Sequence, residues 1–383
     1  MVGGILPPRE FRLFSGVRTS IGHISSLDGL RAFSVLLVFL AHSGLERYIP
    51  GGLGVTIFFF LSGFLITTLM RAEYEASGRV DFPQFWMRRA LRILPPFYVV
   101  LCGATLTTLW LAPGTVLPEA VVARTLHVTN YWLIYRGYAG EPAGTGVYWS
   151  LAVEEHFYLV FPWVYIGLQK LRLSARSQAL MFWGLCLAVL LWRVVLVLVL
   201  DAPTNRTYMA SDTRIDSILF GCALAVWCNP VIDAPPLSER LWKYFIVPGA
   251  MFLLVACLVP RSEAFRQTLR YSLQGVALTF VFVAAIRFQN WAVFRCLNWR
   301  PVAFIGVLSY SLYLLHFNVI FVTQQMLPTI GPIARGVVAF CLSMALAWLV
   351  HLTIEKPCAR LRKKFSGGRI ARSPMAAHPF VTQ

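Results

Sequence analysis

An apolar stretch near the start of the chain contains an arginine and a histidine at a spacing that suits chemistry. The segment "LDGLRAFSVLLVFLAHSG" carries Asp28, Arg31 and His42. Eleven helical steps of 100° make three turns and about 20°, so Arg31 and His42 share one helix face, about 16 Å apart along the axis. A histidine can serve as a general base near neutral pH, and a guanidinium can bind an anion. Asp28 is predicted to form a structural ion pair with Arg31.

A pair of glutamates occurs at a comparable depth in another apolar segment. In "YWSLAVEEHFYLVFP", Glu154 and Glu155 lie about 9 Å from the predicted outer end of the helix. A carboxylate at the level of His42 would orient its imidazole as a base. The sequence therefore predicts a catalytic group of His42 with Glu154 or Glu155, and it does not decide between the two glutamates.

Further polar side chains near the outer ends of apolar segments have either an acceptor-side role or a purely structural one. The segment "TRIDSILFG" contains Arg214 and Asp216, which could form an ion pair. In "LSYSLYLLHFNV", three residues recur at i, i+4 and i+7 and so share one helix face: Ser309, Tyr313 and His316.

A cluster of arginines lies on the predicted cytoplasmic side. The segment "FWMRRALRILPPFYVV" contains Arg88, Arg89 and Arg92, with Arg89 and Arg92 one turn apart. The planar guanidinium fork matches a phosphate with two parallel hydrogen bonds. Together with Arg31, this cluster is predicted to form a second polar layer, at the opposite depth from His42.

The elements that position these residues are membrane helices. The chain has 383 residues, of which 57% are hydrophobic and 13% charged, and its apolar runs of about 20 residues match the thickness of a bilayer. The runs are continuous rather than alternating, which favours helices over a β-barrel. The predicted fold class is all-α, a polytopic membrane protein with about ten transmembrane helices. The expected spans are 27–47, 53–70, 94–113, 148–169, 178–200, 213–229, 241–259, 270–288, 302–325 and 332–354.

The basic residues orient these spans. With both termini cytoplasmic, 23 of the 34 Lys and Arg residues fall in cytoplasmic segments and 9 in external ones, while Arg31 and Arg193 lie inside spans. The positive-inside rule favours this orientation. The net charge of +17 is then a topological and lipid-facing signal, and we expect no nucleic-acid partner.

The chain is predicted to form one membrane domain over 27–354. Residues 1–26 form a cytoplasmic N-terminal segment, and 355–383 form a basic cytoplasmic tail that contacts lipid headgroups and is partly disordered. The eight cysteines occur singly, with no C-x-x-C pair, so neither a disulfide framework nor a metal site is expected.

Taken together, these stretches resemble the acyltransferase family 3 membrane proteins, which modify envelope glycans, lipopolysaccharide O-antigens, lipo-oligosaccharides and similar acceptors. The resemblance extends from about residue 25 to 360, and its pieces occur in family order: "LDGLRAFSVLLVFLAH", "GVTIFFFLSGFLI", "FWMRRALRILPPF", "YWSLAVEEHFY", "TRIDSILFG", "SYSLYLLHFNV" and "IEKP".

The resemblance implies an O-acyltransferase of the cell inner membrane. Such an enzyme moves an acyl group, usually acetyl, from cytoplasmic acyl-CoA to a hydroxyl of a carbohydrate or glycolipid, with acyl-CoA as co-substrate and no tightly bound cofactor. Carried over to this sequence, the catalytic residues are His42 with Glu154 and Glu155, and the acyl-CoA-binding residues are Arg31, Arg89 and Arg92. His42 would act as a general base or form an acyl-imidazole; the sequence leaves both routes open.

The rival hypothesis is a proton-coupled transporter or exporter. A chain of intramembrane titratable groups could relay protons, and the residues available for it are His42, Glu154, Glu155 and Asp216. The cytoplasmic arginine cluster favours the enzyme, because a CoA-binding protein needs phosphate ligands and a relay does not. The sequence does not identify the acceptor, the acyl group or the oligomeric state.

Overall fold

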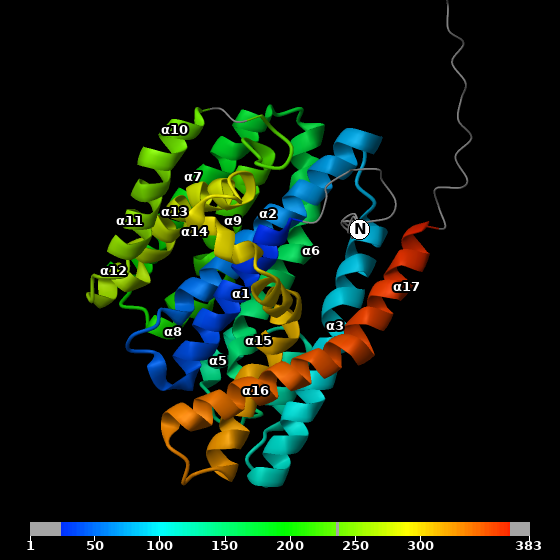
Figure 1. Ribbon diagram of the computed structural model, residues 1–383, viewed down its shortest axis with the longest axis vertical. Helices are drawn as coiled ribbons and strands as arrows, with labels where there is room; N and C mark the ends of the chain where they lie inside the picture. Colours follow the sequence, from blue (N-terminus) through cyan, green and yellow to red (C-terminus); the bar gives the residue numbers. More distant parts are fainter. Residues whose placement is uncertain (1–23, 235–236, 368–383) are drawn as a thin grey trace, which may run out of the picture.

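A computed structural model describes residues 24–234 and 237–367 of the chain (Figure 1). All regular structure among these residues is helical, with no strand, which confirms the all-α prediction. The long helices are α1 (Ser25–Leu40) continued by η1 (Ala41–Leu45), α2 (Gly51–Ser77), α3 (Phe82–Leu111), α6 (Trp149–Lys170), α7 (Ala175–Leu198), α9 (Ser211–Val226), α13 (Leu269–Arg287), α15 (Arg300–Met326) and α16 (Pro332–Val350). Shorter ones are α4 (Pro118–Thr125), α5 (Thr129–Arg136), η2 (Gly146–Tyr148), α8 (Thr204–Met209), α10 (Glu239–Leu241), η3 (Trp242–Ile246), α11 (Val247–Ala256), α12 (Glu263–Gln267), α14 (Ala292–Arg295), η4 (Cys296–Asn298), η5 (His351–Glu355) and α17 (Lys356–Gly367).

Seven helices in the described part of the chain are long and apolar enough to cross a membrane. They are α1 with η1, α2, α3, α7, α13, α15, and α16 with its continuation through η5 to Arg362. The other three expected spans also coincide with helices, namely α6, α9 and the run from α10 to α11. Helix α9 has only 16 residues, which is about 24 Å and shorter than a typical hydrocarbon core.

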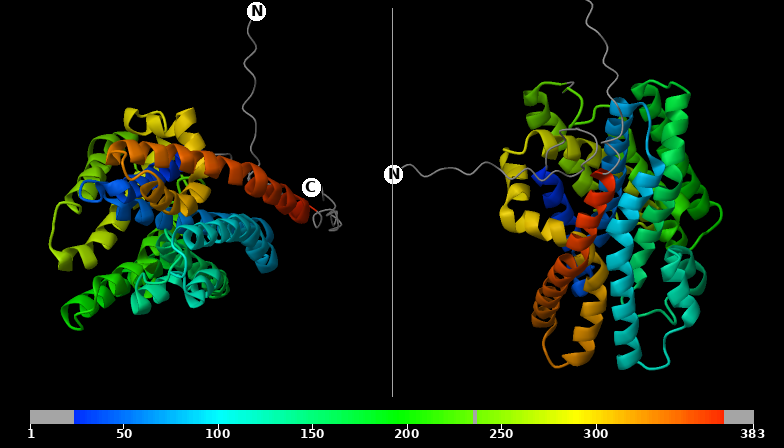
Figure 2. Two further views of the ribbon diagram at one scale, coloured as in Figure 1. Left: turned by 90° about the horizontal axis from the view of Figure 1, so that it is seen from below. Right: turned by 90° about the vertical axis from the view of Figure 1, so that its right-hand side faces the viewer.

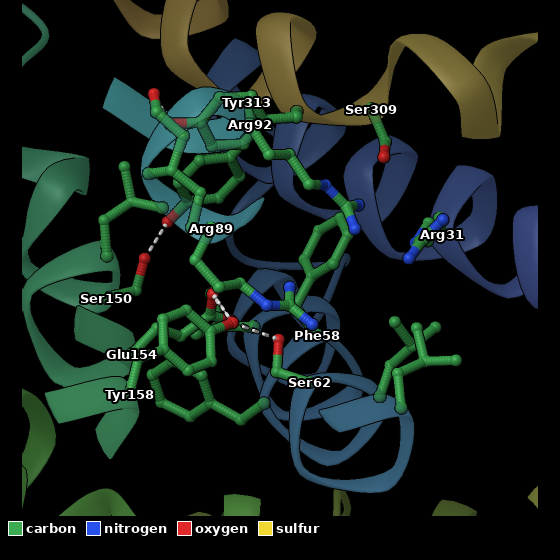
Figure 3. Close-up of a pocket in the computed structure, with 17 residues that line it drawn as sticks. Arg31, Phe58, Ser62, Arg89, Arg92, Ser150, Glu154, Tyr158, Ser309 and Tyr313 are labelled. Atoms are coloured by element: carbon green, nitrogen blue, oxygen red, sulfur yellow. Dashed lines mark hydrogen bonds between the residues drawn. The ribbon is translucent and has the colours of Figure 1, made fainter. Parts of the chain in front are cut away.

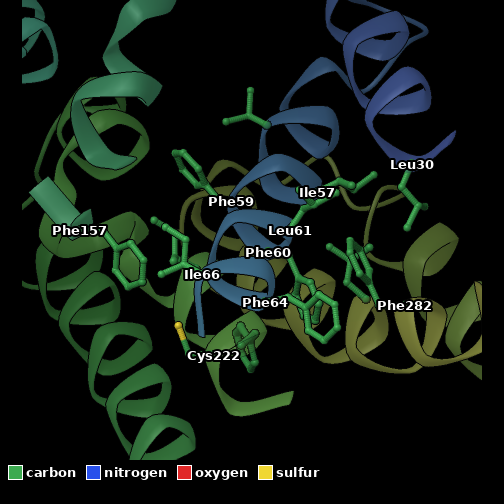
Figure 4. Close-up of a cluster of buried hydrophobic side chains, with 14 of the residues drawn as sticks. Leu30, Ile57, Phe59, Phe60, Leu61, Phe64, Ile66, Phe157, Cys222 and Phe282 are labelled. Carbon is green, nitrogen blue, oxygen red and sulfur yellow. The ribbon is translucent and has the colours of Figure 1, made fainter. Parts of the chain in front are cut away.

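Helix α2 lies at the centre of the bundle, and its aromatic side chains form the middle of the core. Phe60 and Phe64 are fully buried and pack against Phe282 of α13 (Figure 4). Glycines bring α2 and α9 into close contact: a Cβ on Gly63 would lie 2.0 Å from the Ile218 carbonyl oxygen, and one on Gly221 would lie 2.1 Å from that of Phe60. Small residues allow this kind of backbone approach between membrane helices.

Helices α1 and α15 meet in the same way, and this contact fixes the polar residues of both. A Cβ on Gly306 of α15 would lie 2.0 Å from the carbonyl oxygen of Asp28. The two helices then run side by side along most of their length. Arg31 lies one turn beyond this crossing on α1, and Ser309 lies one turn beyond it on α15.

The segment between α3 and α6, here termed the cap segment (residues 112–148), covers the start of α6. It contains α4 and α5 and ends in η2. Arg124 is fully buried and donates to Glu141 and to Thr145 Oγ1 (3.1 Å). Trp149, the first residue of α6, is only 5% exposed. Helix α6 therefore begins beneath folded chain rather than at a free surface.

The helices at the edges present apolar surface and basic ends. Exposed leucines on α7 and α16 are the side chains that a bilayer would cover, and they include Leu187, Leu191, Leu198, Leu342 and Leu349. Helix α17 continues from α16 through η5 and packs beside α3 (Figures 1 and 2). The first part of the basic tail is therefore helical over 356–367, whereas the predictions for residues 1–23 and 368–383 fall outside the described residues.

Candidate active site

A polar pocket opens between helices α1, α2, α3, α6 and α15. Arg31, Arg89 and Arg92 line it, and it encloses about 750 Å³ including its open mouth. Figure 3 shows the side chains of Arg89 and Arg92 reaching into the same space, with Arg31 across from them. The structure therefore brings together the three arginines that the sequence predicts to bind an anion.

One wall of this pocket carries a glutamate held in a hydrogen-bonded network. The Glu154 carboxylate accepts from Ser62 Oγ (2.9 Å) and from the Tyr158 hydroxyl (3.0 Å). The Arg89 guanidinium lies over the Tyr158 ring, 5.2 Å from its centre. Glu154 is thus fixed beside the arginines, while Glu155 is not among the residues that line this pocket.

The arginines differ in how their charge is compensated. Arg31 donates to Asp28 (3.1 Å), as the sequence predicts. Among the residues that the structure describes, Arg89 and Arg92 form no hydrogen bond or ion pair. Arg88, one residue away, is instead paired with Glu73 (3.2 Å) and Gln84 (2.9 Å). Arg89 and Arg92 therefore keep their donors available for a ligand, and Arg88 does not.

His42 lies about 16 Å along α1 from Arg31, and it is paired with a second histidine. His42 Nδ1 is 3.0 Å from Nε2 of His316, and the His42 ring stacks on Phe317 with 4.6 Å between ring centres. His316 is fully buried, and its Nδ1 is 2.7 Å from the carbonyl oxygen of Tyr313. On the helix face of α1 that begins at Arg31, the far end therefore carries the His42 imidazole. Its Nδ1 is engaged with His316.

The expected pairing of His42 with Glu154 or Glu155 is not formed. Glu154 is bonded to Ser62 and Tyr158 in the arginine pocket, and His42 is bonded to His316. The prediction counted depth from the start of each span, as if every span began at the membrane surface. In the structure Glu154 instead lines the same pocket as Arg31, Arg89 and Arg92.

Helix α15 connects the two regions. Ser309 and Tyr313 line the arginine pocket, and His316 on the same face reaches His42. The Tyr313 hydroxyl is 2.6 Å from Ser150 Oγ and donates to the carbonyl of Val147 (3.0 Å). The three residues were predicted to form one group on the outer side. The structure divides them, because Ser309 and Tyr313 line the pocket of the arginines and only His316 contacts His42.

Comparison with known sequences identifies the family of this protein. Residues 24–352 match the model of the acyltransferase domain of the acyltransferase 3 family. The chain belongs to this family. The matched range includes the arginine pocket and both histidines, and it makes the protein an acyltransferase by family, with the multi-pass membrane character that the long apolar helices indicate.

The names of curated relatives describe O-acetyltransferases, two of them for peptidoglycan. The chain is 30% identical over 355 residues to the peptidoglycan O-acetyltransferase OatA of Listeria monocytogenes, covering 89% of this chain and 56% of the relative. It is 30% identical to the putative peptidoglycan O-acetyltransferase YrhL of Bacillus subtilis (88% and 55% covered) and 29% identical to the O-acetyltransferase OatA of Staphylococcus aureus (89% and 58%). The chain thus spans little more than half the length of these relatives. No solved structure matches the sequence.

The predicted pair of Arg214 with Asp216 is not formed in the acyltransferase. Asp216 pairs with Arg193 (2.7 Å) and accepts from Ser272 (3.2 Å). Arg214 is fully buried, donates to Thr56 (3.2 Å) and lies 3.8 Å from the centre of the Tyr271 ring. Two residues apart on a helix, Arg214 and Asp216 point about 200° apart, which explains why they find different partners.

The sequence also missed part of the pocket of this acyltransferase. Tyr158 lies four residues after Glu154, a helical neighbour in "EEHFY" that the spacing could have identified. Ser62 comes from α2 and has no signal in the sequence, because its contact depends on how α2 and α6 pack. Arg362 of α17 lies within electrostatic range of Arg88 and Arg92, so the C-terminal helix adds a further positive charge near the arginine pocket.

Proposed function

We propose that this acyltransferase is a membrane O-acetyltransferase that uses acyl-CoA as donor and a cell-envelope carbohydrate as acceptor. The observation that supports acyl-CoA as the donor is the pair Arg89 and Arg92. Arg89 is half-buried and Arg92 is exposed, both line the pocket, and their N–H groups have no hydrogen-bond partner in the described part of the chain. A phosphate or diphosphate satisfies such donors bidentately. The names of the relatives support acetyl as the acyl group and make peptidoglycan the first acceptor to test.

The proposed topology has ten spans, both termini in the cytoplasm and the protein in the cytoplasmic (inner) membrane. Helices α6, α9 and the run from α10 to α11 supply the three spans beyond the seven long apolar helices. The excess of basic residues in the segments assigned to the cytoplasm supports this orientation. It makes the arginine pocket accessible to cytoplasmic acyl-CoA and places His42 nearer the outer face.

In the proposed reaction, His42 is the general base. Its imidazole removes the proton of the acceptor hydroxyl, the hydroxyl oxygen forms a bond to the thioester carbonyl carbon, and the carbon–sulfur bond breaks. The protonated imidazole then returns its proton to the departing thiolate, so CoA leaves as the thiol. The alternative, in which His42 itself carries the acyl group between donor and acceptor, uses the same imidazole and the same two substrates.

The arrangement does not favour a proton-coupled transporter. Among the described residues, no run of hydrogen bonds connects His42, Glu154 and Asp216. Glu154 is bonded within the arginine pocket, and Asp216 is neutralised by Arg193. The enzyme hypothesis accounts for the unpaired arginines, and a relay does not need them.

The test is release of CoA from radiolabelled acetyl-CoA by the purified protein, with and without soluble peptidoglycan fragments. We expect acceptor-dependent release and labelled carbohydrate, and a loss of about 10²–10⁴-fold in kcat for His42→Ala, the usual contribution of a general base. The matched control is His127→Asn in the cap segment, which we expect to retain activity. Full activity in His42→Ala would refute the role of His42. If the protein releases no CoA from acetyl-CoA in the presence of any carbohydrate acceptor, the proposed reaction is refuted.

A further inference from the structure

The two histidines form a short chain of hydrogen bonds that ends on a backbone carbonyl. The atoms run from the Tyr313 carbonyl oxygen to His316 Nδ1 (2.7 Å), and then from His316 Nε2 to His42 Nδ1 (3.0 Å). His316 is fully buried, and the ring of Phe39 packs near its ring. Phe317 stacks on the His42 ring. Packing therefore holds both rings in this order.

The carbonyl decides where the protons of this chain lie. A carbonyl oxygen only accepts hydrogen bonds, so His316 Nδ1 carries a proton and donates it. A neutral imidazole has one N–H and one lone pair, so His316 Nε2 is the acceptor. The proton between the rings then belongs to His42 Nδ1, which leaves the lone pair of His42 on Nε2. The opposite assignment would put two lone pairs face to face at 2.7 Å.

We propose that His316 is a positioning residue that fixes His42 in its Nδ1–H tautomer and directs Nε2 toward the reacting groups. This inference deepens the proposed function and depends on His42 being the reacting imidazole. It assigns to His316 the orienting task for which the sequence offered a glutamate. His316 touches neither substrate in this role and acts only through His42.

A neutral partner differs from a carboxylate in one respect that suits acyl transfer. The Tyr313 carbonyl cannot take up a proton, so a proton gained at His42 Nε2 has no path out through His316. It stays on the histidine pair until it returns to a substrate group. The hydrogen bonds of the two histidines therefore suit a general base that returns its proton to the leaving thiolate. They do not suit a proton relay across the membrane.

The direct test is ¹⁵N NMR of the full-length protein with labelled histidine. Signals of His42 and His316 are assigned by their loss in His42→Gln and His316→Gln. We expect both rings to be neutral and protonated at Nδ1 near pH 8, with Nε2 unprotonated. A His42 ring protonated at Nε2 would overturn the inference.

Two amide substitutions of similar size provide a matched functional test. In His316→Gln the side-chain oxygen can occupy the position of Nε2 and accept from His42, whereas in His316→Asn the shorter amide reaches the Tyr313 carbonyl but not His42. We expect His316→Gln to retain kcat within about 10-fold and His316→Asn to lose about 10²-fold, the lower end of a general-base contribution. The KM for acetyl-CoA should stay unchanged in both, because the arginine pocket is separate.

The outcomes separate this inference from the proposed function. Equal kcat in His316→Gln and His316→Asn, at equal amounts of folded protein, would show that the contact with His42 does not matter and would overturn the inference. A fully active His42→Ala would refute the proposed base whatever its tautomer. An inactive His42→Ala together with His42 protonated at Nε2 would leave the proposed function standing and remove only the role given to His316.

Discussion

Arg193 and the pocket arginines Arg89 and Arg92 deal with their charge in opposite ways. Arg193 uses its whole guanidinium: it donates to the carbonyls of Thr268 (3.2 Å) and Thr213 (2.5 Å), to Ser272 (2.7 Å) and to Asp216 (2.7 Å). Arg89 and Arg92 line an open pocket and, within the described residues, donate to nothing. A buried charge is expensive unless it is paired. Arg193 is paired by the protein itself, so it has no capacity left for a ligand.

The contrast separates an arginine whose hydrogen bonds are all made within the protein from the two to which we assign the binding of a ligand. Residue type alone does not separate them, although burial differs: Arg193 is fully buried, Arg89 is half-buried and Arg92 is exposed in the pocket. The number of hydrogen bonds that each guanidinium donates also separates Arg193 from Arg89 and Arg92. Arg89 and Arg92 repel one another and form no ion pair with the nearby Glu154 and Glu155, which leaves their N–H groups available for the proposed anionic ligand, whereas Arg193 joins α7 to α9 and α13.

The largest effect is expected from breaking the saturated pair. Asp216→Ala leaves Arg193 charged, buried and without a carboxylate, and loss of one partner of a buried pair costs about 3–5 kcal/mol. We expect a large fall in the Tm of the detergent-solubilised protein and in the folded yield. The control is the double variant Asp216→Ala with Arg193→Met, which removes both charges and should recover much of the Tm. An unchanged Tm in Asp216→Ala would end the structural assignment of this pair.

The next effect is on substrate affinity. Arg89→Ala or Arg92→Ala removes a charge-assisted donor, worth about 1.5–3 kcal/mol, so the KM for acetyl-CoA should rise roughly 10- to 100-fold. The Tm should stay the same or increase, because like charges are relieved. Arg88→Ala is the matched control, since Arg88 is already paired with Glu73. If the KM for acetyl-CoA in Arg89→Ala and Arg92→Ala equals that of the wild type and of Arg88→Ala, the pocket does not bind the donor.

Lysine substitutions give a smaller and more specific effect. Arg89→Lys keeps the charge and loses the planar fork, so the KM for acetyl-CoA should rise only about 3- to 10-fold if the guanidinium binds phosphate bidentately. Arg193→Lys should instead lower the Tm, because one ammonium cannot replace four separate hydrogen bonds. A KM for Arg89→Lys as high as for Arg89→Ala would mean that geometry rather than charge dominates binding, and a wild-type KM would mean that a point charge suffices.

Much of this architecture is encoded in local sequence. Apolar run lengths identified helices at all ten expected ranges, and helical spacing identified the Asp28 and Arg31 pair and the shared face of Ser309, Tyr313 and His316. These features depend on a single helix, where 100° per residue determines which side chains meet.

Contacts between helices were predicted less well. The pair of His42 with His316 depends on the crossing of α1 and α15, which Gly306 permits by lying against the Asp28 backbone. Nothing in one sequence states which helices cross there. The partners of Glu154 were missed for a related reason, because its contact with Ser62 and its place beside Arg89 and Arg92 depend on how α6 packs against α2 and α3.

The half-buried His127 in the cap segment differs from these arginines, because it can lose its charge and stay neutral. Burial lowers the pKa of His127 from 6.5 to about 4, and the nearby His156 adds to this shift. The unfolded chain therefore binds a proton more readily than the native cap, so the stability that neutral His127 provides is present above about pH 6.5 and is lost as the pH falls toward 4.

We expect limited proteolysis of the cap segment to accelerate between pH 7.5 and 5, a smaller effect than those above. His127→Asn suits the left-handed backbone of this residue (φ 54°) and should flatten the dependence. If proteolysis of the cap segment accelerates equally in the variant and the wild type, a group other than His127 causes the pH dependence. The stability of the cap segment would then not depend on His127 being neutral.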